Sequence, residues 1–248
     1  MLEIKNLCFS ASSEEGGTKE IINDVSLTIG KGKLVVITGP NGGGKSTLAK
    51  LIMGIERPTS GQILFNGEDI TSLSVTERAK KGISFAFQQP VKFKGLKVID
   101  LLRIASGKPL SVGDACTYLS AVGLCARDYI DRELNASLSG GELKRIEIAE
   151  ILSRATELSI FDEPEAGIDL WSFNNLIKVF EGMRKDIKEG SLVIISHQER
   201  ILNVADEIVV IGGGRVERHG KREEILPTLL GSADVRNFCT GSVSKEEA

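Results

Sequence analysis

The sequence predicts an α/β fold with a mostly parallel sheet, to which an antiparallel β subdomain and an inserted helical subdomain are added. Short apolar runs separated by segments with helical spacing are the main observation, because strands buried on both faces are apolar throughout. Three runs of four residues are wholly apolar: Leu34–Ile37, Leu192–Ile195 and Ile208–Ile211. Leu158–Phe161 is similar but carries Ser159, and Ile83–Phe87 is a fifth candidate. Strands that alternate with helices indicate a parallel sheet covered on both faces.

The first thirty or so residues follow a different pattern. Leu2–Lys5 and Val25–Ile29 alternate between apolar and polar residues, as strands with one solvated face do. The polar stretch Ala11–Thr18 between them predicts a surface loop. We therefore expect an antiparallel β element beside the main sheet.

Helical spacing is clearest in Thr47–Met53 and Trp171–Lys188. Residues 90–155 hold several helical patterns and no convincing strand, which predicts a helical insertion in the α/β core. We expect one domain over residues 1–248, with residues 1–88 and 156–240 forming the core and residues 89–155 the helical subdomain.

Charge and composition exclude several classes of protein. The chain has 31 basic and 34 acidic residues, so its formal charge of −3 argues against electrostatic wrapping of nucleic acid. Aromatic residues make up 5%, too few for a stacking surface that binds single strands. Apolar runs stop at four residues, which excludes a membrane span, and the start of the chain lacks a signal-peptide pattern. We expect a cytoplasmic protein that does not insert into the membrane.

The cysteines are Cys8, Cys116, Cys125 and Cys239, and no two of them form a C-x-x-C pair. A zinc site normally needs closer spacing. The spacing favours reduced, buried thiols over a metal-binding role.

The segment from Gly39 to Thr47 matches the Walker A pattern G-x-x-x-x-G-K-[ST] and follows the strand Leu34–Ile37 directly. Glycines allow backbone N–H groups to approach phosphate oxygens, and the start of the next helix adds partial positive charge. The alternative, a glycine-rich turn before a helix, does not explain the whole pattern. The predicted ATP-binding residues are Gly39, Asn41, Gly42, Gly43, Gly44, Lys45, Ser46 and Thr47, with Lys45 between the β- and γ-phosphates and the Ser46 hydroxyl on Mg²⁺.

Asp162 and Glu163 end the buried strand that begins at Leu158. Adjacent carboxylates at the end of a core strand are costly unless positive charge lies beside them, and Mg²⁺ with a nucleotide would supply it. We expect Asp162 to be a Mg²⁺ ligand and Glu163 to polarise the attacking water. Two solvated acids at a strand end are the alternative.

Leu138-Ser139-Gly140-Gly141-Glu142 opens another helix. Ser139 and Glu142 form a capping-box pattern, which explains those two residues without any ligand. It does not explain the two glycines, each of which costs up to about 1 kcal/mol relative to alanine in a helix. Their missing side chains leave a bare helix N-terminus that suits a phosphate, so we predict that Ser139, Gly140 and Gly141 bind nucleotide.

These motifs, in this order and spacing, resemble those of the ABC-type ATPases over nearly the whole chain. The resemblance implies a phosphate-loop NTPase core, hydrolysis of Mg-ATP, and a head-to-tail homodimer that forms on ATP. Each ATP would lie between the Gly39–Thr47 loop of one copy and the Ser139–Gly141 tip of the other.

The resemblance extends to three further site residues. Gln88 is similar to the glutamine that contacts Mg²⁺ or water, although Gln89 beside it could occupy the same position in the motif. His197 is similar to the histidine that touches the γ-phosphate, although Ser196-x-x-Glu199 also reads as a capping box. Asp169 is similar to the aspartate that communicates across the dimer, and it can also cap the helix that follows.

The aromatic residue on which ABC ATPases often stack adenine is missing. Its position falls near Ala11, and the nearest ring is Phe9, for which core packing is the simpler role. The identity of a stacking residue therefore stays open.

Glu142 and the Lys144-Arg145-Ile146-Glu147-Ile148 segment are similar to the SufC-like ATPases of iron–sulfur cluster assembly, as is Phe85–Pro90. This implies a soluble SufB/SufD-like scaffold as partner, docked on residues 88–105, where Lys92, Lys94 and Lys97 add positive charge. Glu163–Asp169 fits this group less closely. The alternative function is the ATP-binding subunit of a membrane transporter, with a transmembrane subunit as partner.

Overall fold

A six-stranded sheet forms the centre of the molecule. The computed structural model describes residues 1–12, 17–135, 137–186 and 190–238. The strand order is β10-β9-β3-β8-β7-β6, in which only the edge pair β9 and β10 is antiparallel. The bounds are β3 Leu34–Thr38, β6 Ile83–Ala86, β7 Leu158–Asp162, β8 Ser191–Ile195, β9 Glu207–Gly212 and β10 Arg215–Lys221. The predicted α/β fold is confirmed, and all five predicted apolar runs are strands of this sheet.

Complete burial explains why these strands are apolar. Every residue of β3, β7 and β8 is buried, since helices and the second sheet cover their faces. β3 lies between β8 and β9, and β7 pairs with the other side of β8. Because these strands run parallel, their carboxyl ends meet at one edge, where ligands bind in open α/β sheets.

The second sheet is antiparallel, as predicted, with the order β2-β1-β4-β5. Its strands are β1 Leu2–Ser12, β2 Thr18–Ile29, β4 Ser60–Phe65 and β5 Glu68–Asp69. The predicted surface loop Ala11–Thr18 is too long, because Ala11 pairs with Lys19 and Ser12 with Thr18 at the end of the hairpin. Paired strands that face solvent carry polar side chains there, so polarity alone did not mark the end of the strands.

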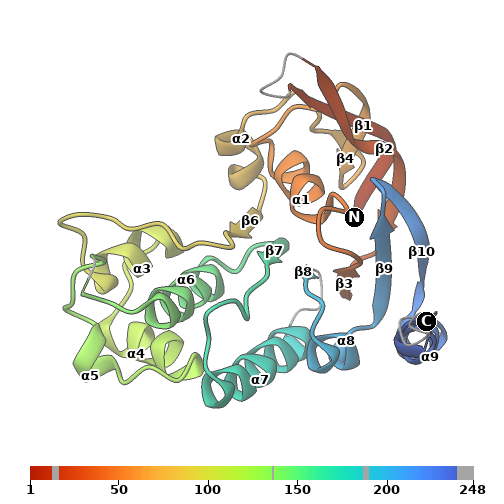
Figure 1. Ribbon diagram of the computed structural model, residues 1–248. Helices are drawn as coiled ribbons and strands as arrows, with labels where there is room; N and C mark the ends of the chain where they lie inside the picture. Colours follow the sequence, from red (N-terminus) through yellow and green to blue (C-terminus); the bar gives the residue numbers. More distant parts are fainter. Residues whose placement is uncertain (13–16, 136, 187–189, 239–248) are drawn as a thin grey trace.

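The described residues form nine helices. They are α1 Lys45–Met53, α2 Val75–Lys80, α3 Val98–Ser106, α4 Val112–Ala121, α5 Ala126–Tyr129, α6 Gly140–Arg154, α7 Leu170–Asp186, α8 Glu199–Val204 and α9 Arg222–Phe238. α3 to α6 lie between β6 and β7 in the chain and gather on one side of the molecule, away from β1 and β2 (Figure 1). These helices occupy the segment predicted to be helical, while its boundaries at residues 89 and 155 remain a prediction.

A buried arginine fixes the end of α1. Arg78 on α2 is 1% exposed, and its guanidinium donates to the carbonyls of Leu51 and Ile52 at 2.7 and 2.8 Å. It thereby satisfies carbonyl groups that the end of a helix leaves unpaired. α1 begins at Lys45, so this contact helps to position the phosphate-binding loop at its other end.

The expectation of buried thiols is wrong for the cysteines that the structure describes. Cys125 is exposed, and Cys8 and Cys116 are partly exposed. Cys239 lies outside the described residues, as does the tail from Gly241. Cys125 immediately precedes α5 at the surface of the helical segment, where apolar packing does not require it. No helix in the described ranges is both long and apolar enough to cross a bilayer.

Candidate active site

The phosphate-binding loop joins β3 to α1 and lines a hollow of about 640 Å³. Gly39 has φ +133°, and a Cβ atom there would lie 2.0 Å from the Ile211 carbonyl oxygen of β9. Only glycine fits where the loop passes this close to a neighbouring strand. Lys45, 6% exposed, folds back and donates to the carbonyls of Gly39 and Pro40, both at 2.9 Å.

All the predicted residues from Asn41 to Thr47 line this hollow, together with Gln88 and Glu163. The lining residues that sequence reasoning missed are Lys19, Glu20, Ile21, Gly213 and Gly214. The Gly213–Gly214 turn joins β9 to β10, and the Gly214 N–H donates to the Gly43 carbonyl at 3.1 Å. The run of three glycines at residues 212–214 was the available signal.

Ser46 and Asp162 meet at the start of α1. The Ser46 hydroxyl donates to Asp162 Oδ1 at 2.9 Å, and Asp162 is 3% exposed. Burial raises the pKa of Asp162, which the Ser46 hydrogen bond partly offsets. The Asp162 carboxylate and the Ser46 hydroxyl are oxygen ligands of the kind that Mg²⁺ prefers. A bound cation would also stabilise the negative charge of this buried carboxylate.

Gln88 and Glu163 contact each other in the lining of the hollow. Gln88 Nε2 donates to Glu163 Oε2 at 2.6 Å. Glu163 adopts φ +45°, a left-handed conformation that is uncommon for a residue with a side chain, and its N–H donates to the Ile195 carbonyl at 3.0 Å. Strained backbone of this kind is concentrated at functional sites. The structure therefore brings Gln88, rather than Gln89, onto the predicted catalytic carboxylate.

His197 is exposed and follows β8 by two residues. The Ser196 N–H before it donates to the Ile37 carbonyl of β3 at 3.1 Å, so His197 lies near the end of the strand that feeds the loop. The predicted capping box from Ser196 to Glu199 is wrong. α8 begins at Glu199 with Gln198 as its N-cap, because the Ser196 hydroxyl is bonded to the buried Glu165 carboxylate instead.

The predicted capping box at the start of α6 is confirmed. Ser139 accepts from the Glu142 N–H at 3.2 Å, and Glu142 Oε2 accepts from the Ser139 N–H at 2.6 Å. A hydrogen bond from Tyr129, followed by the bond from the Ser139 N–H, lowers the pKa of Glu142 to about 2. Gly140 is exposed, and a Cβ atom there would meet nothing within 4 Å. The chain's own packing therefore does not explain this glycine.

The Ser139–Gly141 tip and Asp169 do not line the hollow of their own chain. Asp169 instead accepts from the Ser172 N–H at 3.0 Å and the Ser172 hydroxyl at 2.6 Å, as an N-cap of α7 does. Within one chain the tip is therefore not part of the hollow at the phosphate loop, and its contact with ATP across two copies stays a prediction. The role of Asp169 across a dimer stays a prediction.

Phe9 and Ala11 lie beside the hollow that the phosphate-binding loop lines. Both line a neighbouring hollow of about 470 Å³ with Ile21, Thr47 and Lys50. Phe9 also packs, partly buried, against the core shared by the two sheets. Core packing and contact with a base are therefore both open to Phe9.

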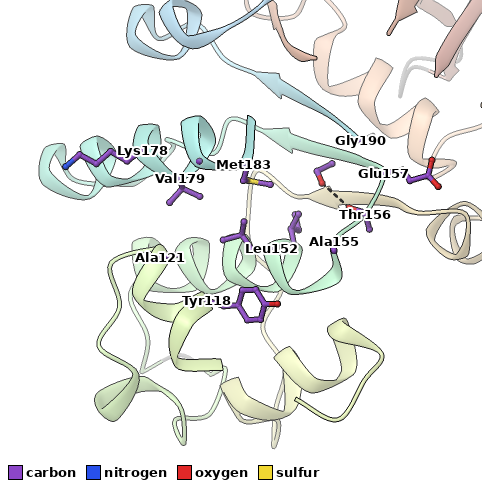
Figure 2. Close-up of a pocket in the computed structure, with 13 residues that line it drawn as sticks. Tyr118, Ala121, Leu152, Ala155, Thr156, Glu157, Lys178, Val179, Met183 and Gly190 are labelled. Carbon is purple, nitrogen blue, oxygen red and sulfur yellow. Dashed lines mark hydrogen bonds between the residues drawn. The ribbon is translucent and has the colours of Figure 1, made fainter. Parts of the chain in front are cut away.

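Two other hollows lie away from the phosphate loop. The first, about 780 Å³ and mostly apolar, lies between α4, α6 and α7 and contains no predicted site residue (Figure 2). Tyr118, Leu152 and Met183 point into it. The second, about 350 Å³, is a mostly apolar groove beside Gln88 whose large exposed apolar residues are Ile55, Val75, Phe87, Val91 and Phe93. We call this second hollow the α2–α6 groove.

Comparison with known proteins decides the family. A family model described as "ABC transporter" matches residues 22–166, which is more than half of the chain. The chain belongs to the ABC transporter ATPase family. It is therefore an ATP-hydrolysing phosphate-loop enzyme that uses ATP with Mg²⁺, as predicted.

Several relatives of this ABC ATPase resemble it over most of their length. It is 39% identical to "Uncharacterized ABC transporter ATP-binding protein MJ0035" of Methanocaldococcus jannaschii, over 84% of this chain and 86% of that protein. It is 36% identical to "Probable ATP-dependent transporter ycf16" of Cyanophora paradoxa, over 90% and 89%. The dimeric structure of MJ0796, a bacterial ABC transporter cassette, matches with a TM-score of 0.80 at 24% identity, covering 90% and 99%, which shows the shared fold.

Proposed function

We propose that this ABC ATPase is the ATP-binding subunit of a membrane transporter and works as a homodimer held together by ATP. The names of the relatives support a transporter subunit rather than the SufC-like role that the sequence motifs suggested. The observation that carries the proposal is the position of the α2–α6 groove. Phe87 lines this groove, and the next residue, Gln88, contacts Glu163 in the active site.

In the proposed reaction, backbone N–H groups of the loop and Lys45 bind the phosphates, and Ser139–Gly141 of a second copy close the site. Ser46 and Asp162, assisted by Gln88, would hold Mg²⁺, which neutralises charge on the phosphates when bound. Glu163 orients the attacking water and His197 contacts the γ-phosphate. Binding of ATP across two copies would close the dimer, and hydrolysis would release it.

The α2–α6 groove fits an apolar segment of a partner protein. It lies between α2, α3 and α6, and exposed apolar side chains from the segment after β6 reach its surface. Val91 is 50% exposed and Phe93 is 42% exposed, an arrangement typical of a binding surface. A transmembrane subunit that inserts an apolar helix here would contact the backbone next to Gln88.

A SufB/SufD-like scaffold is the second candidate partner. Lys92, Lys94 and Lys97 are all exposed beside the groove, and an acidic soluble partner would complement them. The SufC-like segment from Glu142 to Ile148 supports this candidate on sequence alone. It predicts that iron and sulfide bind the partner rather than this chain.

Purification from the native host tests the proposal. We expect the tagged chain to bring down a protein with several membrane spans, and only from detergent-solubilised membranes. A Phe93→Asp variant should lose this partner, whereas the control Ile104→Asp, at an exposed position outside the groove, should retain it. Recovery of a soluble partner that carries iron and sulfide would overturn the transporter and favour the scaffold.

A further inference from the structure

A buried ion pair on α6 attaches this helix to the segment that carries Gln88. Lys144 and Glu147 are 1% and 9% exposed, and Lys144 Nζ lies 3.7 Å from Glu147 Oε2. The Lys144 ammonium donates to the Phe87 carbonyl and, at 3.3 Å, to the Gln88 carbonyl. Glu147 Oε1 accepts from the Phe87 N–H at 2.9 Å. Side chains of α6 therefore bind both backbone polar groups of Phe87.

These hydrogen bonds act where the chain leaves the sheet. β6 ends at Ala86, which pairs with Phe161 of β7, so the β-ladder no longer fixes the backbone beyond it. Gln88 then donates to Glu163 at 2.6 Å. The direction of the Gln88 side chain consequently depends on the attachment of Phe87 to α6. The N-cap of the same helix is Ser139. In the proposed dimer, α6 therefore connects Gln88 of one ATP site with the tip that closes the other ATP site.

Stability alone does not account for the pair. Burial lowers the pKa of Lys144 and raises the pKa of Glu147 to about 7, which shows that both charges are poorly solvated. Glu147 Oε2 accepts no hydrogen bond from the part of the chain that the structure describes. A well-packed apolar pair is often at least as stable as a buried ion pair. Lys144 and Glu147 make hydrogen bonds to the backbone of Phe87 and Gln88, which an apolar pair could not make.

We propose that Lys144 and Glu147 are positioning residues for ATP hydrolysis, which hold Gln88 against Glu163 by clamping the backbone of Phe87 and Gln88 to α6. The proposal rests on the roles proposed above for Gln88 and Glu163, and it does not depend on which partner fills the groove. Since the pair acts through Gln88, it affects turnover only while the Gln88 amide is present.

The test is the double variant Lys144→Met/Glu147→Leu, which removes both charges together and leaves neither one buried alone. We expect its kcat for ATP to fall at least about fivefold while KM changes less than about twofold, because the phosphate loop is untouched. In a chain that already carries Gln88→Ala, the same double substitution should lower kcat by a further factor of less than about two. The control is Lys81→Met/Glu68→Leu, which removes an ion pair of 2.6 Å whose side chains bond to each other and not to Phe87 or Gln88, and it should change neither constant.

Turnover is expressed per nucleotide-binding chain, so that partial misfolding does not mimic a loss of kcat. A second variant, Lys144→Met/Glu147→Gln, retains an acceptor for the Phe87 N–H and should recover part of kcat. Equal losses in both backgrounds would assign the pair to general folding and overturn the proposal. Unchanged turnover in the first double variant, or in Gln88→Ala alone, would overturn it as well. A different partner would leave these ATPase results unchanged, so the two proposals fail separately.

Discussion

Gly140→Ala should make the fold more stable and the enzyme less active. Gly140 is the first residue of α6, and a Cβ atom there meets nothing within 4 Å, so alanine fits without strain. Replacing a helical glycine reduces the freedom of the unfolded chain, and we expect a gain of about 0.3–1 kcal/mol in the free energy of unfolding. For a chain of this length, that corresponds to an increase in Tm of about 1–4 °C.

The loss of activity follows from the same exposed tip. An added methyl group covers the backbone N–H groups that the phosphates of a second copy's ATP would approach. Loss of about 1.4 kcal/mol of transition-state stabilisation lowers turnover tenfold, and we expect a fall of at least about that size. ATP binding to a single chain should change less than about twofold, because Gly140 does not line the hollow of its own chain.

Urea unfolding and steady-state ATPase assays on the same preparation measure both effects. Gly182→Ala on α7 is the control, because this glycine is also helical and also has nothing within 4 Å of a Cβ atom. It should gain stability and keep full turnover. Wild-type turnover in Gly140→Ala, or a loss of stability, would refute the view that this glycine serves a nucleotide held by another copy.

Three further changes test other parts of the account. Glu163→Gln should lower turnover at least about 100-fold, because it removes the carboxylate that orients the attacking water. ATP binding should be retained, because glutamine has the same shape. Turnover within about twofold of wild type would contradict this role of Glu163. Lys45→Ala should weaken ATP affinity, measured by fluorescent-nucleotide titration, and unchanged affinity would refute its contact with phosphate. Tyr129→Phe removes the hydrogen bond that contributes most to lowering the pKa of Glu142 from 4.5 to about 2. A lowered carboxyl pKa stabilises the fold above pH 4.5, and this benefit is lost as the pH falls from 4.5 toward 2. The variant should therefore be less stable by about 1 kcal/mol at pH 6, and urea titrations should show the difference shrinking below pH 4.5; a pH-independent difference would contradict this assignment.

The sheet could be predicted because its strands are buried on both faces. Runs such as Leu34–Ile37 and Leu192–Ile195 have no polar residue that could face solvent, so their pattern predicts strands buried on both faces. The end of the first hairpin was not predictable in this way, since Ser10, Ser12 and Thr18 are polar and nevertheless pair as strand residues. The predicted capping box at Ser196 failed for a related reason. A capping pattern considers only neighbours in the sequence, whereas Ser196 bonds to Glu165, which lies 31 residues away.

The site was predictable where each residue belongs to a motif of fixed spacing. The loop, Asp162 and Glu163 all lie at one sheet edge because their strands are parallel. Lys144 and Glu147 could not be found in this way. They are charged residues on a helix, where the simplest expectation is a solvated face, and only the packing of α6 against Phe87 shows that they are buried. The Gly213–Gly214 turn likewise reaches the site through β9, far from the loop in sequence.

Analytical ultracentrifugation of Glu163→Gln with ATP and Mg²⁺ tests the central claim most directly. The central claim is that one copy binds the triphosphate and the Ser139–Gly141 tip of another copy closes over it. We predict that the 26.7 kDa chain carrying Glu163→Gln doubles its mass when ATP is added, and that Glu163→Gln/Ser139→Arg binds ATP but keeps the mass of one chain. If ATP produced the same dimer in both variants, or in neither, the tip would not be part of the ATP site and the account would be contradicted.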